Sequence, residues 1–289
     1  MKFSKGLPLL AVGLCVPGVA LRALHLRGGF EAGSGLPLPG NGWLWCCIAL
    51  FAVCAVLYAG LARPLAARRA QPFEQLLGTD SPLFRVAAVI AGLLLLVGGV
   101  FYLYLTATTV EQDAVGWARP VEWVYALVTL LVGACAIGLA KAQGHEMTAT
   151  SAKLTLPPLL WSCLHLLVTY RMTCTDPKLP SFAFGLVGDV LVVLAFYQLA
   201  RLLYDKPQPA LLAFFAALAA TVCLSDLGGY GLAWLMGVRT VVWPAKMVLR
   251  GMLSAAACLL LLAELSVLTA GRVQQAQGVS GGAPDDATI

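Results

Sequence analysis

FAFGLVGDVLVVLAFYQL, residues 182–199, is a run of apolar side chains that contains one ionisable residue, Asp189. Its length is close to the roughly 20 residues that an α-helix needs to cross the hydrocarbon core of a bilayer. Backbone groups in hydrocarbon must find their hydrogen bonds within the segment, so the run predicts a transmembrane helix. Charge is costly in that environment, and Asp189 is therefore a candidate functional residue.

The composition indicates that the rest of the chain shares this environment. Of the 289 residues, 60% are hydrophobic and only 11% are charged, and the mean hydropathy is +0.85. A soluble domain usually carries about 25% charged residues. A soluble core of this size could not bury so much apolar surface. We therefore expect an all-α, polytopic integral membrane protein.

The cysteines and the net charge exclude several other classes. Eight of the nine cysteines lie in apolar runs, where they behave as small buried hydrophobic residues. Neither a Cys-x-x-Cys motif nor a Cys/His metal spacing occurs, so we expect no metal and no cofactor. The net charge of +5 comes largely from membrane-flanking loops and does not indicate a nucleic acid as partner. The expected partners are the lipid bilayer, other membrane subunits and an unidentified small molecule.

The apolar runs predict a helical bundle of about eight transmembrane helices in a single domain, residues 1–270. The expected spans are 7–21, 43–61, 83–105, 121–139, 154–170, 182–199, 210–235 and 241–270. Glycines at 228, 229 and 231 are expected to end or bend the seventh helix, and Pro244 to start or kink the eighth. Short similarities between the halves suggest a 4+4 repeat. Residues 271–289 are polar and predict a disordered cytoplasmic tail.

The distribution of Lys and Arg predicts the orientation in the membrane. With eight spans and the N-terminus inside, 11 such residues lie on the inner side and 8 on the outer side. Removing Lys246 and Arg250, which fall within the last span, leaves 6 on the outer side. Because Lys and Arg are in excess in cytoplasmic loops, both termini are expected in the cytoplasm and the protein in the plasma membrane.

Five ionisable residues of the second half lie inside apolar runs: His165, Asp189, Asp226, Lys246 and Arg250. A helical rise of about 1.5 Å per residue places all five roughly 7–13 Å below the same membrane boundary. Their charges balance, and we predict a ligand-binding or ion-binding cluster. Arg250 is expected to pair with Asp226, with Lys246 or His165 near Asp189. In the alternative, the two bases extend to the headgroups and the last span starts after them.

The cluster favours a permease-like or small-ligand-binding membrane protein in which Asp189 binds a cation or a proton. One alternative is a non-transporting membrane subunit or sensor whose intramembrane charges lock helices together. Another is an intramembrane enzyme that uses two carboxylates. The run from Gly185 to Asp189 resembles the Gly-x-Gly-Asp motif of intramembrane aspartyl proteases, although it departs from that motif at one of the two required glycines.

Overall fold

The computed structural model describes residues 6–71, 73–109, 118–142, 153–174, 176, 178, 181–202 and 207–270. Within them the regular structure is helical, apart from one isolated β-bridge between Phe30 and Pro37. The predicted all-α bundle is confirmed. The predicted tail at 271–289 lies outside the described residues.

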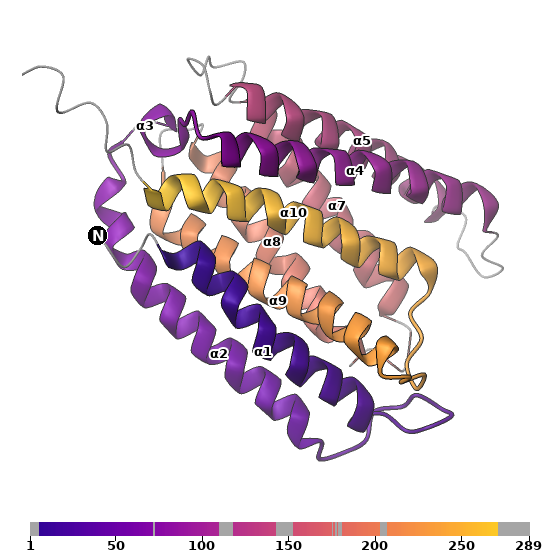
Figure 1. Cartoon of the computed structure of the whole chain (residues 1–289). Helices are drawn as coiled ribbons and strands as arrows, with labels where there is room; N and C mark the ends of the chain where they lie inside the picture. Colours follow the sequence, from indigo (N-terminus) through magenta and orange to yellow (C-terminus); the bar gives the residue numbers. More distant parts are fainter. Residues whose placement is uncertain are drawn as a thin grey trace, which may run out of the picture.

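The long helices, labelled as in Figure 1, are α1 (Leu7–Gly28), α2 (Gly42–Ala62), α4 (Pro82–Thr108), α5 (Ala118–Ala142), α7 (Leu156–Thr173), α8 (Ala183–Arg201), α9 (Pro209–Leu235) and α10 (Ala245–Ala270). The short ones are η2 (Arg63–Arg68), α3 (Phe73–Leu77) and η3 (Lys153–Thr155).

Seven described helices, α1, α2, α4, α5, α8, α9 and α10, are long and apolar enough to cross a membrane. This finding supports a polytopic membrane protein. Helix α7, the fifth expected span, is not among the seven, because two prolines, a histidine and an arginine lower its hydropathy. It nevertheless packs between α5 and α8 within the bundle.

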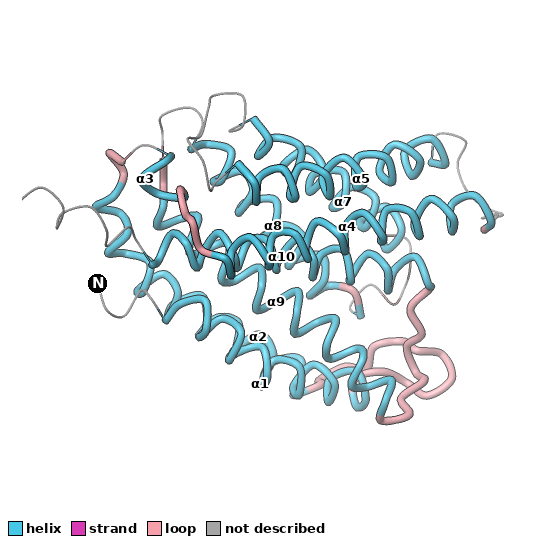
Figure 2. The backbone as a smooth tube through the Cα atoms, turned by 45° about the horizontal axis from the view of Figure 1, so that its top comes forward, coloured by secondary structure: helices cyan, strands magenta, loops and turns pink. Residues whose placement is uncertain are grey.

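Six of the long helices form a closed ring. Each packs against the next in the order α4, α5, α7, α8, α9 and α10, and α10 packs in turn against α4 (Figure 1). Helices α1 and α2 lie outside this ring and pack against α9, as the tube view in Figure 2 also shows. Helices α9 and α10 are the most buried of the candidate spans and α2 is the least buried. The ring therefore creates an interior that polar side chains can occupy away from lipid.

The contacts of the two halves of the chain are not alike. Helix α8 packs closely on α9, whereas α2 and α4, their counterparts in a 4+4 repeat, share little contact.

The outer surface of the bundle is apolar, and Leu9, Val56 and Leu83 are among its most exposed large side chains. Such a surface is compatible with lipid and would promote association in water.

Helix α9 packs against α1 through glycines. A Cβ atom added at Gly228 would overlap the side chain of Val19, and one added at Gly229 would overlap the side chain of Arg22. Small residues allow two membrane helices to approach closely enough for their backbones to pack. Helix α9 continues to Leu235 without a break. The expectation that these glycines end the seventh helix was wrong, because α9 runs past them to Leu235 and two of them, Gly228 and Gly229, allow close packing against α1.

Helix α10 begins directly after Pro244, which confirms that this proline starts a helix. The Pro244 carbonyl oxygen accepts hydrogen bonds from the backbone N–H groups of Met247 (2.8 Å) and Val248 (3.1 Å). The last span therefore starts at Ala245 and not at residue 241, as the apolar run suggested. Lys246 consequently lies in the first turn of α10.

The α1–α9 contact predicts opposite effects for two neighbouring glycines. Gly229→Ala should lower the free energy of unfolding in detergent by about 1–3 kcal/mol, because the new methyl group overlaps Arg22. Gly231→Ala is the matched control, since nothing lies within 4 Å of a Cβ at Gly231. The control should be neutral or slightly stabilising, because Ala favours helix more than Gly does. Equal effects of the two changes in a denaturant titration would contradict this packing.

Candidate functional site

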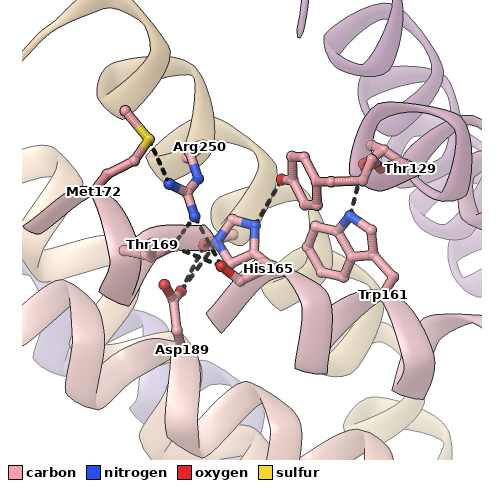
Figure 3. A network of polar contacts seen from close by, with 9 residues as sticks. Thr129, Trp161, His165, Thr169, Met172, Asp189 and Arg250 are labelled. Atoms are coloured by element: carbon pink, nitrogen blue, oxygen red, sulfur yellow. Dashed lines mark hydrogen bonds and ion pairs between the residues drawn. The ribbon is translucent and has the colours of Figure 1, made fainter. Parts of the chain in front are cut away.

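His165 of α7 lies at the centre of a hydrogen-bond network that joins three other helices (Figure 3). Its Nδ1 is 2.7 Å from the hydroxyl of Tyr125 on α5, and its Nε2 is 2.8 Å from the hydroxyl of Ser254 on α10. Ser254 donates a hydrogen bond of 2.8 Å to Oδ1 of Asp189 on α8, and His165 Nε2 is 3.3 Å from the same oxygen. Every donor meets an acceptor when a neutral His165 carries its proton on Nε2. The predicted proximity of His165 and Asp189 is therefore confirmed.

Arg250 of α10 is buried beside this network and forms no ion pair within the described part of the chain. Its side chain donates to the backbone oxygen of His165 (2.8 Å), to Oγ1 of Thr169 and to the sulfur of Met172 (3.0 Å). Its guanidinium carbon lies 5.8 Å from the centre of the Tyr125 ring. Among the described residues, no carboxylate lies within 4.0 Å of Arg250, and its Nε–H group has no hydrogen-bond partner. The hydrogen bonds that the described residues offer to this buried cation thus all come from neutral groups.

Asp226 of α9 pairs with Arg22 of α1 and not with Arg250. Arg22 Nε donates to Asp226 Oδ1 over 2.7 Å, and both side chains are almost fully buried. The same guanidinium donates to the backbone oxygen of Ser181 and lies 2.6 Å from Nδ1 of His25. The expected pairing of Arg250 with Asp226 was wrong, because α1 extends to Gly28 and its glycine-mediated packing brings Arg22 against α9.

Lys246 lies in a third, separate contact. Its ammonium group is 2.8 Å from Oε2 of Glu122 on α5, and Arg171 lies 3.9 Å from the other oxygen of that carboxylate. Lys246 is 6% exposed and Arg250 is 1% exposed. The alternative in which both bases extend to the headgroups therefore does not hold.

A cavity lies inside the ring, against α7, α8, α9 and α10. Its volume is about 40 Å³, counted as the space open to the centre of a water molecule. This is enough for a few waters or a very small molecule, since one water needs about 10–15 Å³ on the same measure. Four of the five predicted site residues line it, and Lys246 does not. The lining residues are His165, Thr169, Phe182, Gly185, Asp189, Cys223, Asp226, Leu227, Trp243, Met247, Arg250, Gly251 and Ser254.

The spacing of polar residues along α10 could have identified one of the site residues that the sequence analysis missed. Lys246, Arg250 and Ser254 follow at intervals of four, which places them on one face of a helix. A search along that face would have found Ser254. Tyr125 has no comparable signal, because a tyrosine in an apolar run is unremarkable. Arg22 was missed because a charge was taken as the end of the first span.

The geometry limits the chemistry of the site. Ser254, His165 and Asp189 are the residue types of a catalytic triad, but that triad needs the serine and the acid on opposite ring nitrogens. Here both contact Nε2. Asp189 and Asp226 are held by different partners, and nothing in their contacts indicates a shared proton. Among the described residues, no group of three or more His, Cys, Asp or Glu side chains is placed to hold a metal ion.

Comparison with protein-family models, with curated proteins and with solved structures finds no match for this chain. The fold and the contacts of the described residues therefore carry the functional argument by themselves.

The two candidate partners of Asp226 can be distinguished by double substitution. Arg22→Gln alone should lower the free energy of unfolding by about 3–5 kcal/mol, because it leaves the Asp226 carboxylate buried without a counter-charge. Adding Asp226→Asn should restore much of that loss. Asp226→Asn should not rescue Arg250→Gln. Rescue of Arg250→Gln and not of Arg22→Gln, measured by thermal unfolding in detergent, would refute the observed pairing.

Proposed function

We propose that this protein is a permease-like or small-ligand-binding membrane protein, and that the cavity lined by His165, Asp189, Asp226 and Arg250 is its binding site. The supporting observation is Arg250, a buried cation on the cavity wall that forms no ion pair with any described residue and whose Nε–H group lacks a hydrogen-bond partner among them. Burying an ionised group costs several kcal/mol unless it is paired. An ionisable residue that carries such a cost within a membrane helix is a candidate functional residue.

Helix locking accounts for only some of the buried charges. Arg22–Asp226 joins α1 to α9, and Lys246–Glu122 joins α10 to α5. These two pairs fit the alternative of a non-transporting subunit in which charges hold helices together. Arg250 differs from them, because among the described residues it forms no ion pair and holds α10 to α7 through neutral groups only. A sensor that binds a ligand would use the same cavity and belongs to the same proposal.

We infer that the cavity belongs to the outer half of the plasma membrane and that both termini are cytoplasmic. The support comes from the Lys and Arg count, with α7 taken as a span. Arg22, Lys246 and Arg250 are buried in the bundle. The outer loops then keep five basic residues, Arg27, Arg119, Arg171, Lys178 and Arg239, against 11 on the inner side. This difference is in the direction that the positive-inside rule requires.

A binding site must be reachable from water, and native cysteines can test this requirement. Cys223 lines the cavity, whereas Cys258 on α10 is fully buried and does not line it. In variants that keep one cysteine each, 2-aminoethyl methanethiosulfonate should modify Cys223 and leave Cys258 unmodified. The exposed Cys174, just after α7, serves as the positive control. Mass spectrometry of the intact protein in membranes provides the measurement. Modification of Cys174 without modification of Cys223 would contradict a ligand-accessible cavity.

A further inference from the structure

We propose that the ligand of this cavity is a small zwitterion, a molecule that carries one carboxylate and one ammonium group. This inference rests on the proposed function and names the chemical class of its ligand. It follows from where the unfilled hydrogen-bonding groups of the cavity lie and from the balance of charge around them.

Two buried N–H groups on the cavity wall lack an acceptor. Within the described part of the chain, neither Arg250 Nε nor Trp243 Nε1 has a hydrogen-bond partner, and both residues line the cavity. Arg250 is 1% exposed and Trp243 is 6% exposed, so bulk water does not satisfy them. A buried donor without a partner costs about 1–3 kcal/mol. Two such donors on the wall of one cavity indicate a ligand with acceptor oxygens, and the charge on Arg250 favours a carboxylate.

The same cavity has acceptors for a cation. Asp189 and Asp226 each use Oδ1 for the ion pairs and hydrogen bonds that they form with described residues, and Oδ2 of neither side chain takes part in them. Gly185, also on the cavity wall, leaves Oδ2 of Asp226 uncovered. A Cβ atom at that glycine would lie 2.8 Å from this oxygen. The two free oxygens are suitable acceptors for an ammonium group.

The charges around the cavity favour a ligand of zero net charge that carries both a carboxylate and an ammonium group. Arg22 neutralises Asp226, and Arg250 and Asp189 carry opposite charges on the same wall, so the site is neutral when His165 is neutral. An isolated carboxylate or ammonium group would bring an uncompensated charge into a region of low dielectric constant, which is costly. A zwitterion brings no net charge and can satisfy both sets of groups. Because the cavity is small, about 40 Å³, glycine and β-alanine are suitable probes, since they are among the smallest zwitterions.

Three probes separate the two charged groups of the ligand. Thermal unfolding of the purified full chain in lipid nanodiscs would be measured with glycine or β-alanine, with sodium acetate and with methylammonium chloride, at constant ionic strength. A ligand that binds only the folded state raises the melting temperature by an amount that grows with the logarithm of 1 + L/Kd, where L is the free ligand concentration. We expect at least one of the two zwitterions to raise it at a concentration at least tenfold lower than acetate or methylammonium. Equal potency of acetate would mean an anion site, and no shift with either zwitterion would mean that the cavity holds water only; both results would overturn the proposal.

Two conservative variants test the residues that carry the argument. Trp243→Phe keeps the aromatic ring that stacks on Tyr230 and removes the N–H group, and Gly185→Ala places a methyl group over the free oxygen of Asp226. Each should weaken zwitterion binding about tenfold. Their matched controls are Trp45→Phe on the lipid-exposed face of α2 and Gly231→Ala on α9, which should leave binding unchanged. Equal binding by test and control variants would overturn the assignment. Modification of Cys223 is independent of the ligand, so it shows separately whether the proposed function survives.

Discussion

The ion pair between Arg22 and Asp226 determines how the other charges in this bundle can be arranged. A carboxylate within a membrane helix is tolerated when a counter-charge lies against it. Arg22 supplies that charge from outside the six-helix ring, because glycines on α9 let α1 approach closely. Asp226 therefore does not need Arg250. The arginine inside the ring is left without a carboxylate and borders a cavity.

The buried polar groups consequently divide into two kinds. The Arg22–Asp226 and Lys246–Glu122 pairs cross between helices at short distance and stabilise the assembly of α1 with α9 and of α5 with α10. The group formed by Tyr125, His165, Ser254 and Asp189 is hydrogen-bonded around His165, and these contacts use only one oxygen of the Asp189 carboxylate. The groups proposed to bind a ligand thus lie beside structural ion pairs on the same helices, in particular on α10.

Much of the fold could be predicted from the sequence, because length and apolarity of a segment largely decide whether it spans a bilayer. The gathering of His165, Asp189, Asp226 and Arg250 followed from helical rise and alternating direction alone. Their partners could not be predicted in the same way. Pairing depends on which helices are neighbours in space, and Arg250 and Asp226, one hairpin apart, do not meet. The sequence pattern of the α9 glycines predicts the end of a helix. In the structure, Gly228 and Gly229 instead allow α1, with Arg22, to pack closely against α9.

The proposed role of Arg250, which forms no ion pair among the described residues, is to bind a ligand carboxylate in the cavity. An experimentally determined density map of the full chain in nanodiscs with glycine, at a resolution that shows ordered water, tests it most directly. We expect the ion pair between Arg22 and Asp226 to be visible. We also expect density for a bound molecule that extends from Arg250 toward Asp189. A direct ion pair of Arg250 with Asp189 or Asp226, with side chains filling the cavity, would contradict it.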